Sequence, residues 1–196
     1  MRPSFPRGCL CALALALAAA GRAQTLQADL SFPHALHQWD ATGWSVDFGA
    51  VLEDRHFLGL EFTDFHQQFT AGFPVYGAAH VDERIDSLQL AYRYSFPLGV
   101  LWGGRPNGPL EAYLGAAGGL GRVRQALAAT GAAPPAPQQE TEFCAELAAG
   151  LQWQFGPFMG IKAGFRYIDS INNVRLFNAD ANTDTKTLEV GVVFRY

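Results

Sequence analysis

The sequence predicts an all-β protein, an eight-stranded antiparallel up-and-down transmembrane β-barrel. Three observations support this fold class. Apolar and polar residues alternate with a period of two in eight stretches, as expected of strands with two unlike faces. The connections between these stretches alternate between short and long along most of the chain. After residue 23, no apolar segment approaches the roughly 20 residues that a membrane helix needs.

The first 23 residues have the pattern of a secretory signal peptide. Arg2 and Arg7 precede the apolar run Cys9–Ala20, and Gly21-Arg22-Ala23 places small residues before a cleavage site. We expect residues 1–23 to be removed and residues 24–196 to form one outer-membrane β-barrel domain. Lipidation of Cys9 or Cys11 is the competing reading, and the small-residue cleavage site fits the sequence better.

Composition after cleavage excludes several functional classes. Three of the fourteen basic residues lie in the leader, so eleven remain against eighteen acidic ones, a formal charge of −7. A nucleic-acid partner is therefore not expected. Cys144 is the one cysteine left of three, so no intramolecular disulfide is expected. Stability must come from packing and strand pairing.

Eight strands follow from the alternation. They are Thr25–Phe32, Trp44–Leu52, Phe57–Phe69, Arg84–Phe96, Leu110–Arg124, Thr141–Phe155, Phe158–Ser170 and Thr185–Tyr196. Thr25–Phe32 is the least certain of these because no turn residue fixes its end.

The connections are unequal in length. Glu53–His56 and Gly156-Pro157 are short, and the four long connections are predicted to be exposed loops: Pro33–Gly43, Thr70–Glu83, Gln125–Glu140 and Ile171–Asp184. An even number of strands then places both ends of the barrel domain on the short-turn, periplasmic side. Pro97–Pro109 departs from this scheme, because it should be short; either it is an elaborated turn or the adjoining strands extend into it.

Sorting each strand by parity separates an apolar face from a polar one. The polar face is rich in glycine and contains charges of both signs, which can pair inside a crowded eight-stranded lumen. We predict a lumen charge network of Asp47, Glu61, Arg93, Glu111, Glu146, Lys162, Arg166, Glu189 and Arg195. A salt-bridge lattice that holds the barrel shut is preferred over a gated ion path, because an eight-stranded lumen has little room for water.

Alternation alone does not say which face is inside. A soluble periplasmic lipocalin-like binding barrel would place the apolar face inward around a ligand cavity. The glycine-rich polar face, the mixed lumen charges and the aromatic residues at strand ends favour the inverted, membrane arrangement. The aromatic residues expected to form girdles at the two membrane interfaces are Trp44, Phe96, Trp153, Phe155, Tyr167 and Tyr196.

The last predicted strand ends in Glu189-Val190-Gly191-Val192-Val193-Phe194-Arg195-Tyr196. This order resembles the C-terminal signal of bacterial outer-membrane barrels, with Glu189, Gly191, Phe194 and Tyr196 at the matching positions. Together with the leader and the loop pattern, the chain resembles the small barrels of the OmpA-transmembrane-domain and OmpX type. The resemblance implies insertion into the outer membrane of a Gram-negative-type bacterium by the barrel assembly machinery. With the last strand ending at Tyr196, no peptidoglycan-binding domain is expected after it.

Candidate chemistry is sparse. Some barrels of this size hydrolyse lipid A with a Ser nucleophile and a nearby His, so we considered a deacylase-like enzyme. Ser170 is the only candidate nucleophile worth testing, and its base would have to come from another strand, for example His66. We prefer the interpretation that Ser170 simply ends a strand. No catalytic residue is therefore predicted.

No cofactor or metal is predicted either. His34, His37 and His80 could in principle bind zinc or copper, but their spacing is not diagnostic and exposed loop histidines are the better interpretation. Cys144 is expected to be a small buried filler of the lumen face.

The leading hypothesis is a non-enzymatic outer-membrane protein with a structural or surface-interaction role. Its expected partners are outer-membrane lipid and lipopolysaccharide, the assembly machinery during biogenesis, and an extracellular partner that contacts the loops.

Overall fold

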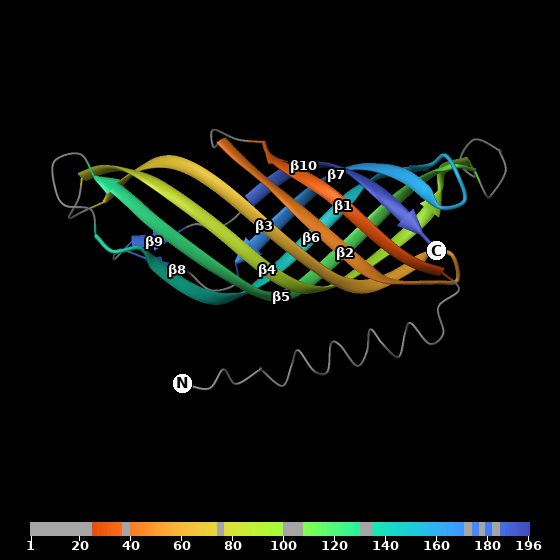
Figure 1. Ribbon diagram of the computed structural model, residues 1–196, viewed down its shortest axis with the longest axis horizontal. Coiled ribbons are helices and arrows are strands. Elements are labelled where there is room, and N and C mark those ends of the chain that lie inside the picture. The colour runs from red at the N-terminus through yellow and green to blue at the C-terminus, as the bar shows by residue number, and fades with distance from the viewer. Residues whose placement is uncertain are drawn as a thin grey trace, which may run out of the picture.

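A closed barrel of eight antiparallel strands is the core of the computed structural model, which describes residues 25–36, 40–73, 77–99, 108–129, 135–170, 174–176, 179–181 and 185–196 (Figure 1). The barrel strands are β1 Thr25–Ala35, β2 Asp40–Leu52, β3 His56–Phe73, β4 Gly77–Pro97, β5 Leu110–Ala129, β6 Gln138–Gln154, β7 Met159–Ser170 and β10 Thr185–Arg195. Each pairs with its neighbours in sequence, and β1 pairs with β10 to close the ring. The predicted fold class is confirmed.

The seam between β1 and β10 begins at the end of the barrel with the short turns. Leu26 N donates to the carbonyl oxygen of Tyr196 at 2.9 Å, and Tyr196 N donates to the carbonyl oxygen of Leu26 at 2.8 Å. The register continues without a break to Ala35 opposite Thr187. The start of β1 and the end of β10 therefore lie together at this end, as predicted, and the C-terminus lies there in Figure 1.

The strands are unequal in length, so one side of the barrel projects beyond the other (Figure 1). β3, β4, β5 and β6 have 17 to 21 residues, whereas β1, β2, β7 and β10 have 11 to 13. We call the part of β3–β6 that rises past the shorter strands the projecting wall. It lies at the end of the barrel opposite the short turns.

Two of the four predicted loops are therefore wrong for most of their length, and a third is wrong for half of it. β1 and β2 extend into 33–43, β3 and β4 into 70–83, and β5 and β6 into 125–140. The reason is that the backbone ladder continues: Phe73 still pairs with Gly77, and Ala79 with Ala129. The alternation also persists, with Val81 buried next to exposed His80. Small and turn-forming residues concealed this pattern in the sequence.

The remaining connections depart less from expectation. The predicted loop Ile171–Asp184 contains a separate short hairpin, β8 Val174–Leu176 and β9 Ala179–Ala181. β4 ends at Pro97 and β5 begins at Leu110, so the adjoining strands do not extend further into this connection, of which residues 100–107 lie outside the described part. The predicted signal peptide also lies outside it. No described helix is long and apolar enough to cross a membrane.

Most large apolar side chains face outward and most buried side chains are polar, although Phe57, Phe65 and Val123 also lie in the lumen. The side chains of Leu147, Val190 and Phe48 are 61%, 63% and 59% exposed, respectively. Those of Arg166 and Lys162 are each 1% exposed. This is the reverse of what a soluble lipocalin-like barrel would need.

The predicted girdle residues lie toward the two ends of the barrel. Trp44 and Tyr167 are near the projecting-wall end, and Phe96, Trp153, Phe155 and Tyr196 near the short-turn end. Trp44 also packs against Phe62, with ring centroids 5.3 Å apart.

The turn between β2 and β3 has an unusual backbone. Arg55 N donates to the carbonyl oxygen of Leu52 at 3.1 Å, and the two central residues, Glu53 and Asp54, have φ of 51° and 59°. Positive φ at both positions defines a type I′ turn, whose twist matches that of the flanking strands. Such positions favour Asn and Gly, and a long side chain such as Glu is strained there.

Replacing Glu53-Asp54 with Asn-Gly should therefore stabilise the barrel. We expect the free energy of unfolding to rise by about 1 kcal/mol, because the left-handed conformation costs less for Asn and Gly. The measurement is denaturant unfolding of the detergent-solubilised barrel. Arg55→Asn, one residue beyond the left-handed pair, is the control and should give no gain; an equal gain in both would contradict the explanation.

Candidate functional site: a buried charge network in the lumen

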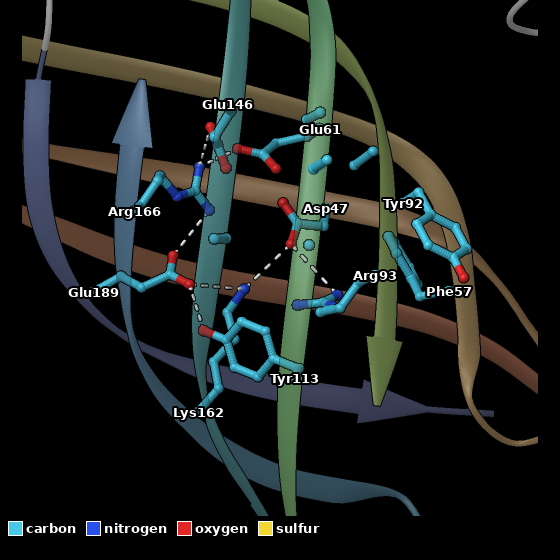
Figure 2. Close-up of a pocket in the computed structure, with 15 residues that line it drawn as sticks. Asp47, Phe57, Glu61, Tyr92, Arg93, Tyr113, Glu146, Lys162, Arg166 and Glu189 are labelled. Carbon is cyan, nitrogen blue, oxygen red and sulfur yellow. Dashed lines mark hydrogen bonds and ion pairs between the residues drawn. The ribbon is translucent and has the colours of Figure 1, made fainter. Parts of the chain in front are cut away.

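Arg166 is the centre of the charge network in the lumen (Figure 2). It extends from β7 and donates through Nη1 to Glu61 of β3 and, at 3.2 Å, to Glu146 of β6. Its Nη2 donates to Glu189 of β10 at 2.8 Å. One guanidinium thus connects four strands across the barrel. A planar group with five donors suits this arrangement, because it satisfies several carboxylates at once.

Lys162 and Arg93 hold a second group of carboxylates nearer the short turns. Lys162 Nζ lies 3.2 Å from Asp47 Oδ2 and 3.4 Å from Asp29 Oδ2. Arg93 Nη2 lies 2.6 Å from Asp29 Oδ2. Lys162 Nζ also lies 3.8 Å from Glu189 Oε1, so the two groups form one network.

Tyr113 packs inside the lumen between the charged groups. Its hydroxyl donates to Glu189 Oε1 at 2.8 Å, and the Arg93 guanidinium lies 5.4 Å from its ring centre. Gly150 and Gly164 pair across β6 and β7 beside it. A Cβ on Gly150 would lie 2.6 Å from the Tyr113 hydroxyl oxygen. The absence of a side chain there makes room for the ring.

Carboxylates outnumber cations in this network. Among the described residues, the cations that pair with these carboxylates are Arg93, Lys162 and Arg166, and the carboxylates are Asp29, Asp47, Glu61, Glu146 and Glu189. Hydrogen bonds from neutral donors supplement the ion pairs: Gln27 to Asp29 at 2.9 Å, Thr63 to Glu61 at 3.0 Å, and the Tyr113 hydroxyl. Cations and polar hydrogens together stabilise the surplus negative charge.

Little free volume remains between these side chains. A cavity of about 20 Å³ lies among Asp47, Glu61, Arg93 and Tyr113, and another of about 10 Å³ lies near Cys144. A cavity of this size accommodates about one water molecule. The described lumen is therefore packed at its middle.

Further polar layers lie above and below the network. Toward the projecting wall, Glu83 accepts hydrogen bonds from the amides of Gln67 and Gln125. Toward the short turns, Arg195 Nη2 lies 3.1 Å from Glu111 Oε2, and Arg195 Nε donates to Gln27 at 3.0 Å. The buried polar side chains thus extend along most of the barrel.

The structure brings seven of the nine predicted network residues into contact at the middle of the lumen. The other two, Glu111 and Arg195, pair with each other nearer the short turns. The prediction omitted Asp29 and Tyr113 from the network. Parity does place Asp29 on the polar face, and it could have placed Tyr113 there too, since Tyr113 lies between outward-facing Ala112 and Leu114. No sequence signal indicates which partners the two residues meet.

Known structures share this architecture. No protein-family model matches the chain, and no curated protein matches it in sequence. Neisserial surface protein A is 17% identical with a TM-score of 0.54, covering 88% of this chain and 96% of that one. The N-terminal β-barrel domain of Pseudomonas aeruginosa OprF is 16% identical with a TM-score of 0.50, covering 89% and 98%. Pseudomonas aeruginosa OprG is 12% identical with a TM-score of 0.50, covering 89% and 97%.

This chain has the small outer-membrane β-barrel fold. Identities this low establish the fold alone. Within a small outer-membrane barrel, the position of each remaining candidate residue can be compared with the chemistry proposed for it.

The deacylase-like pair is not brought together. Ser170 is at the end of β7, with its backbone paired to Cys144 of β6. His66 lies on β3, across the ring from β7, on the outer face, where its Nε2 is 3.0 Å from Asp82 Oδ1. The structure therefore does not supply His66 as a base for Ser170.

The histidines proposed as metal ligands are also separated. His34 is exposed on β1 and His80 is exposed on β4, where its Nδ1 lies 3.1 Å from the Thr70 hydroxyl; His37 lies outside the described residues. Among the described residues, no group of three or more His, Cys, Asp or Glu side chains is arranged to hold a metal ion. Cys144 is buried in the lumen.

The four residues of the C-terminal signal differ in their contacts and in their exposure to solvent. Glu189 points into the lumen and binds Arg166 and Tyr113. Gly191 pairs with Ser31, where a Cβ would lie 2.6 Å from the Ser31 hydroxyl. Phe194 lies on the outward-facing side and Tyr196 is 74% exposed. Two of the four residues therefore also have a packing role within the barrel.

Arg166→Met should destabilise the barrel severely. The change leaves Glu61, Glu146 and Glu189 without their common cation, and breaking a buried ion pair costs about 3–5 kcal/mol. Denaturant unfolding in detergent measures the loss. Adding Glu146→Gln to Arg166→Met should restore part of the stability by removing one uncompensated charge.

Arg195→Met is the matched control, because its pair with Glu111 is partly exposed to solvent. Its cost should be about 1 kcal/mol or less. Equal losses of unfolding free energy for Arg166→Met and Arg195→Met would show that the central network stabilises the barrel no more than the Arg195–Glu111 pair does.

Proposed function

We propose that this protein is an integral outer-membrane barrel with a closed lumen, acting as a non-enzymatic envelope or surface-interaction protein. The observation that supports this best is the inversion of its faces. A belt of exposed Leu, Val, Ile, Phe and Trp side chains surrounds a lumen filled with paired charges. In water such a belt would aggregate, whereas in lipid the closed ring pairs each barrel strand with a neighbour on both sides and leaves no open sheet edge along the belt.

The proposed orientation follows from the strand ends. Short turns face the periplasm in barrels of this class, so the projecting wall would face the exterior. The wall presents polar side chains from β3 and β4 beyond the last row that pairs with β2, including Thr70 and His80. These are the described residues that an extracellular partner would meet first. The packed middle of the lumen supports a structural role over conduction.

Leu147→Lys tests the membrane insertion. Leu147 is 61% exposed at the middle of the apolar belt on β6, and a Lys at the bilayer midplane costs about 2–4 kcal/mol. We expect folding into lipid vesicles to lose that much stability, measured by urea titration. Leu36→Lys, at an exposed site beyond the belt, should change the free energy of unfolding by less than about 1 kcal/mol. An unchanged midpoint for Leu147→Lys would exclude lipid contact at this face.

Tyr196→Ala tests the proposed assembly signal separately from stability. The substitution removes the terminal aromatic side chain and retains the two backbone hydrogen bonds to Leu26 that begin the seam. We expect the amount of barrel in the outer membrane to fall severalfold, with Tyr196→Phe close to wild type. Refolding of purified Tyr196→Ala in detergent should remain normal. Equal losses in cells and in detergent would assign Tyr196 a role in stability instead.

A further inference from the structure

The outer surface changes abruptly from apolar to charged on β3, β4 and β5. One row of paired residues across β2 to β6 is entirely apolar: Val46, Phe62, Leu88, Leu120 and Phe143. The next outward-facing row toward the projecting wall is Trp44, Asp64, Asp86, Arg122 and Thr141. Two residues along a strand span about 7 Å. The charged row is therefore at the depth of lipid headgroups if the apolar row contacts lipid tails.

Three arginines gather at this boundary. Arg84, Arg122 and Arg124, together with Asp64 and Asp86, form what we call the arginine patch. Arg84 binds Asp64, and its Nε lies 3.2 Å from Asp86 Oδ1. Arg122 Nη2 and Arg124 Nη2 lie 3.2 and 3.5 Å from Asp86 Oδ2. Three guanidiniums against two carboxylates leave a local formal charge of +1.

The arrangement also places like charges directly opposite each other. Arg84 and Arg124 pair directly across β4 and β5, and like charges in that relation destabilise a sheet. The same is true of Asp64 and Asp86 across β3 and β4. Asp86 is shared by all three arginines, whose side chains remain 42% to 51% exposed. An anion between Arg84 and Arg124 would relieve their repulsion.

We propose that the arginine patch binds the phosphate groups of an anionic lipid of the outer leaflet. Arginine suits this role because its planar donors bind phosphate oxygens in pairs, and the patch directly adjoins the apolar row that would hold the acyl chains. Charge, depth and the adjoining apolar surface together fit a phosphorylated lipid better than a soluble anion. The inference rests on the membrane insertion proposed above.

The test uses protein purified from membranes in detergent, with bisphosphorylated lipid A as the probe and binding measured by native mass spectrometry. Each basic side chain at a headgroup contributes a factor of about five, so Arg84→Gln/Arg124→Gln should bind about thirtyfold more weakly. Lys186→Gln, an exposed basic residue of β10 on another side of the barrel, is the matched control and should stay within about twofold of wild type. Should the double variant not fold, Arg124→Gln alone should show about a fivefold loss.

Three further measurements distinguish lipid binding from other roles. Dephosphorylated lipid A should bind the wild type weakly, and millimolar inorganic phosphate should not displace the lipid. Lipid A should raise the unfolding temperature of the wild type more than that of the double variant; an equal rise in both would assign the lipid to another surface.

The inference would be overturned by unchanged lipid binding in the double variant, by equal binding of dephosphorylated lipid, by displacement with free phosphate, or by an equal lipid-induced rise in unfolding temperature in both proteins. Membrane insertion is measured independently with Leu147→Lys. A protein that inserts normally but shows no phosphate preference would refute the lipid site and leave the proposed function standing.

Discussion

The pairing of Arg166 with carboxylates from three other strands is the interaction on which the interior depends. Eight strands enclose a lumen that side chains must fill, and here most of those side chains are polar. A charge in such a place is costly unless its partners are within hydrogen-bonding distance. Glu61, Glu146 and Glu189 come from β3, β6 and β10, so the ion pairs also connect strands that share no backbone hydrogen bonds with one another.

Much of this architecture could be predicted from the sequence because a strand's period of two is a local property. Parity assigns Arg166, Lys162 and Glu189 to the face opposite Leu147 and Val190 without knowledge of any contact. The number of strands follows in the same way. These are features that each strand determines by itself.

Other features depend on contacts between distant strands and were not predictable. The ends of β3, β4 and β5 depend on how far the neighbouring strand continues the backbone hydrogen-bond ladder. Small residues there, such as Ala79 and Ala129, do not reveal in the sequence that the strands continue. The place of Tyr113 depends on the two glycines beside it in β6 and β7, which are far away in sequence. Its partner Glu189 is separated from it by 76 residues.

The seam between β1 and β10 has a consequence for the order of events during biogenesis. Hairpins such as β2–β3 join strands that are adjacent in the chain, so their pairing does not depend on any later strand. The ring cannot close in this way, because β10 is the last barrel strand in the chain and its partner β1 is the first. Until β10 is in place, β1 and β7 both have unpaired edges. The sheet is therefore open to pairing with other chains at two edges until this one strand docks, and closure removes both edges in a single step.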